Sequence, residues 1–201
     1  MKAKTEAKRQ EILRAAGEVF REVGFERASM SDIRARLGGS KATLYNYFPS
    51  KEALFFEVMH QARSTELTGI VAGLNADADD LKHELIRFGQ NFIAVVYSPE
   101  AIAVRRLAIA EAKASDVGKQ VFERSTGPIE ELVAGFLKKA MNRGALRKAD
   151  ARIASIHLLS LLESEFLQRV LLGVIDSVKP DAVTGAVRRA VDVFLSGYAR
   201  R

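Results

Sequence analysis

The chain has 201 residues, of which 48% are hydrophobic and 28% are charged, a balance typical of a folded protein rather than a disordered segment. It has no cysteine, which excludes disulfides and cysteine-ligated metals and fits a cytoplasmic protein. The net charge is +6, and residues 1–51 hold 11 Lys and Arg against 6 Asp and Glu, so most of the positive excess lies in the first quarter. A basic region of this kind is typical of proteins that bind a polyanion, although a solvated basic face would have the same composition.

No stretch of the sequence reaches the roughly 20 apolar residues that a membrane-spanning helix needs. The run from Ile153 to Leu162 stops at Glu163. The charged N-terminal residues lead into an amphipathic pattern, not into the apolar segment of a signal peptide. We therefore expect no membrane association and a cytoplasmic location.

The first predicted helix covers residues 5–23. Apolar side chains such as Ile12, Ala16 and Val19 recur at helical spacing along it and form one stripe. Gly24 follows directly and is well placed to end the helix.

Two short helices are predicted next, each with a serine where an N-cap belongs. Ser29, with Asp32 three residues later in a capping-box arrangement, begins a helix over residues 30–37. Gly38-Gly39 breaks that helix, and Ser40 can cap a second one over residues 41–48. A short helix, a glycine turn and another short helix within 20 residues have the architecture of a helix-turn-helix.

The rest of the chain is predicted as longer helices, which makes the protein all-α with about nine helices. Strand-like alternation is absent, and proline or small polar residues separate the segments. We place a domain boundary near residue 50, giving an N-terminal domain of residues 1–50 and a C-terminal domain of residues 51–201. The remaining predicted helices cover residues 51–74, 81–97, 99–114, 116–143 (bent near Gly127-Pro128), 149–173 and 180–199.

The second short helix is the candidate DNA reader. Its apolar residues Leu44 and Phe48 can face the first helix, which leaves polar and basic positions on the outward side. Base edges in the major groove offer donors and acceptors to such side chains, and phosphates accept from them as well. The plain alternative is a three-helix cap that packs on a larger bundle and binds nothing. The outward residues are Lys41, Thr43, Asn46 and Tyr47.

The same segment resembles the DNA-binding domain of the TetR/AcrR family over about residues 8–58. The most specific part is the run Thr-Leu-Tyr-x-Tyr-Phe-x-x-Lys-x-x-Leu, which stands here at residues 43–54. The resemblance implies that Lys41, Ala42, Thr43 and Asn46 face bases. It implies that Ser29, Tyr45, Tyr47 and Lys51 hold phosphates, although a partly buried core position is the alternative for Tyr45.

Two positions depart from that family pattern. Arg34 stands where a small residue is usual, and its stem would have to extend out to solvent or to a phosphate. Gly39 replaces a turn residue that is usually apolar. Neither change removes a side chain that is expected to contact DNA.

Residues 80–198 resemble the AefR-like C-terminal domain found in one branch of the family. The resemblance rests on Tyr-Ser-Pro-Glu at 97–100, the run at 105–112, Gly-Ala-Leu-Arg at 144–147 and the run at 192–198. It implies a homodimer formed by the last two helices, about residues 152–198. A two-fold dimer would place two recognition helices on a roughly palindromic operator.

The family resemblance also implies a small-molecule effector bound among the helices of the C-terminal domain. Apolar or aromatic compounds fit the physics of such pockets. The alternative for each aromatic candidate is plain core packing, and for the histidine a satisfied core position. The candidate effector-binding residues are Phe88, Asn91, Phe92, Arg106, Glu111, Phe122, Phe136 and His157.

The three histidines, His60, His83 and His157, have no second ligand at a spacing typical of a metal site. There is no glycine-rich phosphate loop, nucleophile elbow or cysteine nucleophile. We therefore expect no metal, cofactor or catalysis. The family resemblance implies a ligand-responsive regulator, which we expect to be a repressor released by its effector. The competing hypotheses are a helical protein-interaction module and a small all-helical enzyme that uses the C-terminal pocket.

Overall fold

The computed structural model describes residues 2–113 and 116–200, and within them it is helical throughout apart from turns and one isolated bridge between Leu146 and Ala199. The all-α prediction is confirmed. Three of the four N-terminal helices begin and end close to the predicted residues, while the first extends past its predicted end at Val23 and is kinked at Gly24, whose φ of 77° is non-helical. The four are α1 (Lys2–Arg27), α2 (Met30–Leu37), α3 (Lys41–Tyr47) and α4 (Lys51–Ala72).

The C-terminal part contains more elements than the five helices expected there, because two of those helices are subdivided. The expected end of one helix at Ala114 lies outside the described residues. The elements are α5 (Leu81–Val96), α6 (Pro99–Glu111), α7 (Val117–Val121), the π-helical segment η1 (Phe122–Thr126), α8 (Gly127–Asn142), α9 (Ala151–Glu163), α10 (Leu167–Leu171) and α11 (Pro180–Tyr198).

A π-helical segment lies directly before Gly127-Pro128, where the sequence predicts a bend. Proline has no N–H, so Pro128 cannot donate the usual helical hydrogen bond to the carbonyl of Arg124. The preceding N–H, that of Gly127, donates instead to the carbonyl of Phe122, five residues back. This wider turn joins α7 to α8, and such turns are frequent at functional sites.

The helix expected over residues 149–173 is broken after Glu163. The Ser164 hydroxyl donates to the carbonyl of Leu161 at 2.7 Å, and the Ser164 N–H donates to the same carbonyl at 3.2 Å. This local bonding competes with the regular helical ladder. The chain then makes a turn and continues as α10.

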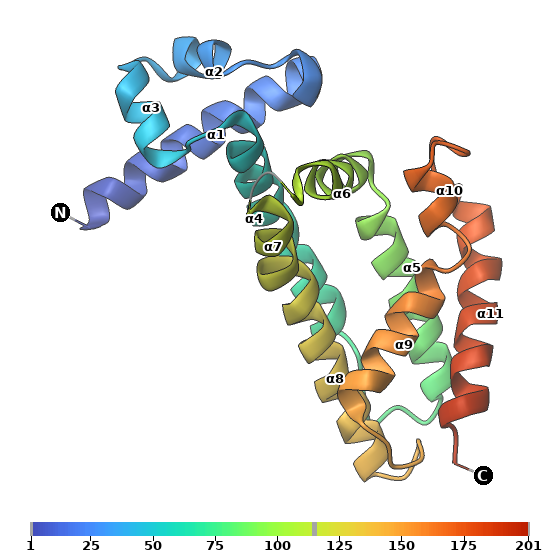
Figure 1. The fold of residues 1–201 in the computed structure, drawn as a ribbon. Coiled ribbons are helices and arrows are strands. Elements are labelled where there is room, and N and C mark those ends of the chain that lie inside the picture. The colour runs from blue at the N-terminus through green and yellow to red at the C-terminus, as the bar shows by residue number, and fades with distance from the viewer. Residues whose placement is uncertain (1, 114–115, 201) are drawn as a thin grey trace.

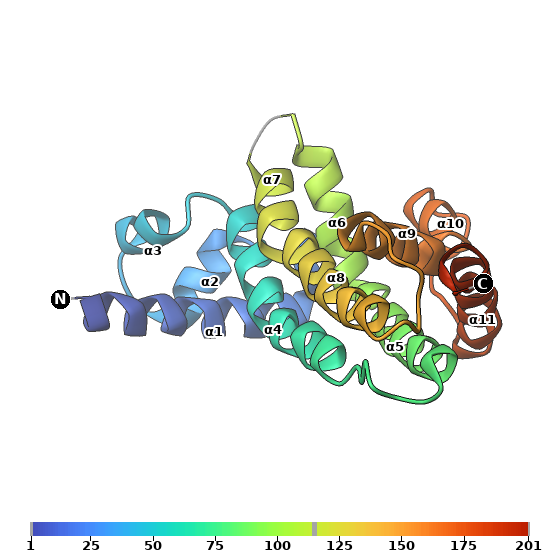
Figure 2. The ribbon, with the colours of Figure 1, turned by 90° about the horizontal axis from the view of Figure 1, so that it is seen from below.

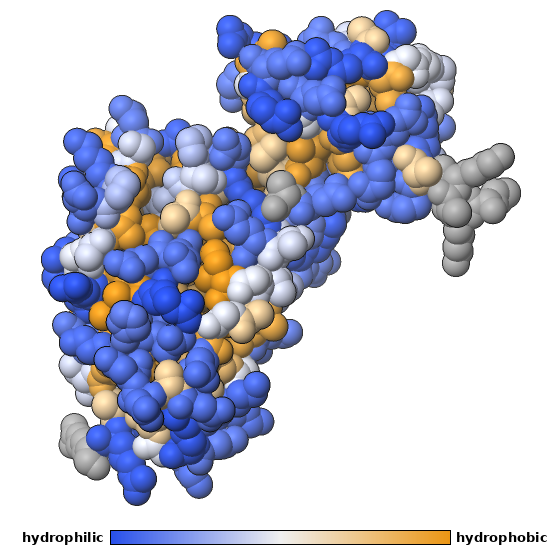
Figure 3. Space-filling view, turned by 180° about the vertical axis from the view of Figure 1, so that it is seen from behind, coloured by the Kyte–Doolittle hydropathy of each residue, from blue (hydrophilic) through white to orange (hydrophobic). Residues whose placement is uncertain are grey.

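The molecule has a small lobe and a larger one joined by α4 (Figure 1). Helices α1, α2 and α3 form the small lobe, and α4 runs from it along α8 into the large lobe (Figures 1 and 2). In the large lobe α5, α9 and α11 pack against one another. The space-filling view shows apolar side chains gathered where the lobes meet and along the large lobe (Figure 3).

Two groups of buried apolar residues correspond to these lobes. The first is built from α1, α2, α3 and the start of α4, and includes Ile12, Ile33 and Leu44. The second is built from the end of α4 and the later helices, and includes Phe88 and Phe194. Because α4 contributes to both groups, the boundary at residues 50 and 51 stays a prediction.

Candidate DNA-binding surface and effector cavity

Ser29 and Ser40 cap the two short helices of the helix-turn-helix. The Ser29 hydroxyl accepts from the N–H of Asp32 at 3.2 Å, and the Asp32 carboxylate accepts from the N–H of Ser29 at 3.0 Å. The predicted capping box is therefore present. At α3 the Ser40 hydroxyl accepts from the N–H of Thr43 at 3.1 Å. These local bonds fix where both helices begin.

The turn between α2 and α3 requires its two glycines. Gly38 has φ 65° and Gly39 has φ 140°, and residues with a side chain rarely adopt either conformation. The glycine that departs from the family pattern at position 39 therefore matches the backbone of this turn. Arg34, the other departure, is exposed, so its side chain extends to solvent, whereas the neighbouring Ile33 is buried.

Helix α3 buries one face and presents the other. Leu44 is fully buried and Phe48 is 3% exposed, and both pack in the core of the small lobe. Figures 1 and 2 show α3 at the outer edge of that lobe. Its exposed side chains are Lys41, Ala42, Tyr45 and Asn46, while Thr43 and Tyr47 are half-buried.

Lys51 lies where the small lobe meets the start of α4, and its ammonium group has partners within the chain. Nζ donates to the carbonyl of Phe25 at 2.9 Å and to that of Glu26 at 3.4 Å. It also lies 4.3 Å from the centre of the Phe25 ring. The residue thus holds the end of α1 against α4, a role that the sequence did not indicate. One N–H remains for a phosphate, so that contact stays a prediction.

A cavity of about 680 Å³ lies in the large lobe beneath the small one. Its walls come from α4, α5, α6, η1, α9 and neighbouring residues, and they combine apolar side chains with several charged ones. The apolar walls include Phe56, Met59, Leu67, Phe92, Val104, Phe122, Ile129 and Leu159, and the charged or imidazole-bearing ones are His60, Arg63, Arg105, Arg124, Glu130 and Glu163.

Two of the eight predicted effector-binding residues, Phe92 and Phe122, line this cavity. Phe88 and Phe136 are instead buried in the core of the large lobe. Phe88 is one turn from Phe92 on α5, but it is 1% exposed and does not line the cavity. Periodicity alone could not separate these two positions.

The four predicted polar anchors lie elsewhere. Asn91 is exposed on α5. Arg106 donates to the carbonyl of Val170 at 2.6 Å and lines a separate hollow of about 200 Å³. His157 is exposed, and its Nδ1 lies 2.7 Å from the hydroxyl of Tyr198. Glu111 is half-buried and is not among the wall residues. These positions face away because the packing of α5, α6 and α9 turns other faces inward.

The polar wall residues on α4 were not predicted from the sequence, although their spacing on α4 indicates them. Phe56, His60, Arg63 and Leu67 are three or four residues apart and therefore share one helix face. Polar residues between apolar ones on a single helix face indicate that the face lies inside the protein but lines an open space there. That mixture could have selected His60 and Arg63 in advance.

Arg105 and Glu163 form an ion pair in the wall between α6 and α9. Arg105 donates to the carboxylate at 2.5 Å and 3.3 Å, and Tyr97 donates its hydroxyl to the same carboxylate at 2.9 Å. Burial, followed by the charge of Glu163 and this hydrogen bond, raises the pKa of Tyr97, so the phenol stays protonated. The charge of Arg105 is thus balanced inside the wall.

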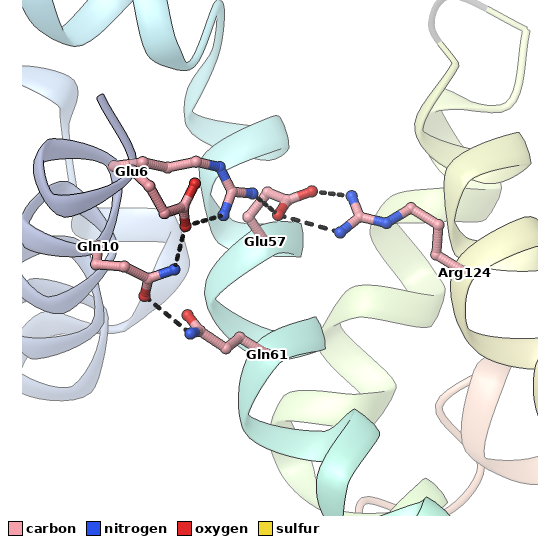
Figure 4. A network of polar contacts seen from close by, with 6 residues as sticks. Glu6, Gln10, Glu57, Gln61 and Arg124 are labelled. Atoms are coloured by element: carbon pink, nitrogen blue, oxygen red, sulfur yellow. Dashed lines mark hydrogen bonds and ion pairs between the residues drawn. The ribbon is translucent and has the colours of Figure 1, made fainter. Parts of the chain in front are cut away.

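Glu57 connects three elements at the junction of the lobes (Figure 4). It lies on α4, is 9% exposed, and accepts hydrogen bonds from Arg9 of α1 and Arg124 of η1. Burial raises the pKa of Glu57, but the hydrogen bond from Arg124 and the charges of both arginines outweigh it, and the net pKa is lower than usual. Gln61 of α4 donates to Gln10 of α1 at 2.8 Å beside this pair.

His60 lies one turn along α4 from Glu57 and faces η1. Its Nδ1 is 3.1 Å from the hydroxyl of Ser125. Burial and the nearby charge of Arg124 lower the pKa of His60, against the opposing charge of Glu57. The imidazole therefore adds no charge to the cavity at neutral pH.

Comparison with known proteins assigns both parts of the chain to one family. Residues 12–58 match the family model for bacterial regulatory proteins of the tetR family. Residues 83–200, more than half of the chain, match the model for the C-terminal domain of AefR-like transcriptional repressors. The chain belongs to the TetR family. The resemblances inferred from the sequence are confirmed, and this TetR-family chain is a DNA-binding transcription regulator.

Solved structures of other TetR-family proteins have the same fold as this chain. A TetR-family transcriptional regulator from Mesorhizobium loti is 27% identical, with a TM-score of 0.83, and the match covers 98% of each chain. The flavonoid-responsive regulator FrrA is also 27% identical, with a TM-score of 0.70 over 98% of this chain and 99% of that one.

A curated relative from Bacillus subtilis, the uncharacterized HTH-type transcriptional regulator YvdT, is 38% identical over 79 residues. The match spans 39% of this TetR-family chain and 41% of the relative.

Among the helices of residues 2–113 and 116–200, none has the length and hydropathy of a membrane span.

Proposed function

We propose that the protein is a repressor that binds a palindromic operator as a homodimer and is released by a small-molecule effector. The observation that carries this proposal is the polar outward face of α3 on the basic small lobe, with an effector-sized cavity directly beneath that lobe. We also propose the domain division at residues 50 and 51, a cytoplasmic location, and DNA contacts by Ser29, Lys41, Ala42, Thr43, Tyr45, Asn46, Tyr47 and Lys51.

The dimer is proposed to form through the last two long helices, about residues 152–198. In support, large apolar side chains on and between these helices are exposed, namely Ile153 at 45%, Leu172 at 76%, Val174 at 65% and Val193 at 57%. A dimer interface would cover apolar surface of this kind. A two-fold axis there would direct both copies of α3 to the same side, as two successive half-sites require.

Release is proposed to follow from differential binding. An effector can empty the operator only if it binds the released conformation more tightly than the DNA-bound one. The cavity touches α4, the helix that carries the small lobe, so filling it can change the position of that lobe. The effector is expected to have an apolar or aromatic body, and FrrA, a relative of the same fold, is flavonoid-responsive.

Selection of bound fragments from a random DNA library tests this function. We expect enrichment of a near-palindrome with half-sites about one helical turn apart. A dimer that contacts about 6–10 phosphates should lose roughly 10³–10⁵ in affinity between 50 and 200 mM salt.

A Val193→Glu variant should be monomeric in analytical ultracentrifugation and should no longer select a palindromic sequence. The control variant Leu132→Glu, on the outer face of α8, should stay dimeric. No enriched sequence and no salt dependence would refute the proposal.

A further inference from the structure

Arg63 is a cavity wall residue whose positive charge has only a weak, exposed counter-charge. Its side chain is 17% exposed, and it donates to the uncharged hydroxyl of Ser98 at 2.9 Å. The nearest ion-pair partner in the described parts of the chain is Glu100 at 3.7 Å, whose own side chain is 58% exposed. A carboxylate in water compensates a buried cation poorly. Arg63 therefore brings a positive charge into the wall without a buried counter-charge.

The other charged wall residues do not supply that counter-charge. Arg105 and Glu163 neutralise each other across α6 and α9. Arg124 shares the carboxylate of Glu57 with Arg9, which also pairs with Glu6 at 3.9 Å, so the carboxylate of Glu57 is already engaged by two arginines.

The remaining acidic wall residue is Glu130, so the wall itself contains three arginines and two glutamates, and Glu57 lies behind it as the partner of Arg124. Burial lowers the pKa of Arg63, against the charges of Glu100 and Glu66, which is the sign of a cation that has lost water without gaining a full partner.

We propose that the effector is an organic anion, a carboxylate or sulfonate on an apolar body, whose anionic group binds the Arg63 guanidinium. Arginine presents a planar set of donors that matches such groups, and hydrogen bonds between ionised partners are the strong ones in proteins. The apolar body would lie against Phe56, Phe92 and Leu159 in the same cavity. This inference rests on the proposed function, because it names the chemistry of the same effector.

Two fluorescent probes test the charge requirement. 1-Anilinonaphthalene-8-sulfonate has an aromatic body with one negative charge, and N-phenyl-1-naphthylamine has the same body without the sulfonate. Titrations without DNA would give the affinity of each probe for the wild type, Arg63→Gln, Arg63→Lys and Lys138→Gln. The last variant removes one positive charge from the exposed face of α8 and is the matched control.

The sulfonate should bind the wild type at least about tenfold more tightly than the neutral probe. Arg63→Gln should weaken the sulfonate roughly 10- to 100-fold and leave the neutral probe within twofold, which also shows that the cavity is intact. The affinity of Arg63→Lys for the sulfonate should lie between those of the wild type and Arg63→Gln. The affinity of Lys138→Gln should match that of the wild type. Equal affinity for both probes, or a sulfonate affinity that Arg63→Gln does not change, would overturn the inference. Because no DNA is present, either outcome leaves operator binding to be judged by its own experiment.

Discussion

Arg124 of the π-helical segment donates hydrogen bonds to both carboxylate oxygens of Glu57 on α4, one of them at 3.3 Å. Glu57 also accepts from Arg9 of α1, so one buried carboxylate joins the small lobe, the connecting helix and a wall of the cavity. The pair is thus a direct physical connection between the predicted DNA-binding and effector-binding regions.

Glu57→Gln should destabilise the protein by about 1–3 kcal/mol, because two guanidinium groups lose their shared counter-charge. This destabilisation is smaller than that expected for a fully buried ion pair, because both arginine side chains are about a third exposed. Urea unfolding of both proteins would measure the difference. Glu22→Gln, which removes the exposed partner of Arg36, should leave stability nearly unchanged. Equal effects from the two variants would contradict the assigned role of Glu57.

The contribution of Glu57 should depend on pH. Its pKa is lower in the folded protein than the value of about 4.3 expected for an unfolded chain. Its stabilising effect is therefore complete above that value and is lost as pH falls through the folded pKa. The stability difference between wild type and Glu57→Gln should be constant from pH 6 to 7 and should shrink below about pH 4. A stability difference between the two proteins that grew as the pH fell would contradict this prediction.

Gly89 permits a close crossing of α5 with α9 and α11. A Cβ atom built there would lie 2.6 Å from Leu162 Cδ2 and 2.7 Å from Val187 Cγ1. Gly89→Ala should therefore destabilise the large lobe by about 1–3 kcal/mol, despite the better helix propensity of alanine. Gly135→Ala on α8, where nothing lies within 4 Å, should stabilise by about 0.5–1 kcal/mol. Thermal unfolding of the two variants should move in opposite directions.

Lys51→Ala should lower stability as well as affinity for DNA. The variant loses hydrogen bonds to the carbonyls of Phe25 and Glu26 and the contact with the Phe25 ring, together worth about 1–3 kcal/mol. Lys41→Ala, an exposed position on α3, should change stability by less than about 0.5 kcal/mol. If Lys51→Ala unfolded at the same urea concentration as the wild type, its contact with α1 would be of no structural importance.

Helix boundaries in the small lobe could be predicted from the sequence because caps and glycine turns are local. Ser29 bonds to Asp32, and Ser40 bonds to Thr43, three residues away in each case. Gly38 and Gly39 end α2 through backbone conformations that other residues avoid. Such signals need no knowledge of how the helices pack.

The cavity walls could not be predicted in the same way because they depend on contacts between distant segments. Arg63 meets Ser98, and Glu57 meets Arg124, across 35 and 67 residues of sequence. Phe88 and Phe92 share a stripe on α5 and both are buried in the core, but only Phe92 also lines the cavity. Periodicity selects the buried face of a helix, but it does not show where a space remains.

The most direct test of the account is the base preference of Asn46→Ala. Wild type and variant would be titrated against the selected operator and against operators with each base pair replaced in turn. Because Asn46 is exposed on α3, the variant should lose discrimination of about 1–3 kcal/mol at one symmetric pair of positions and keep the discrimination at the others. Equal weakening on every operator, or no change at all, would contradict the assignment of α3 as the helix that reads DNA.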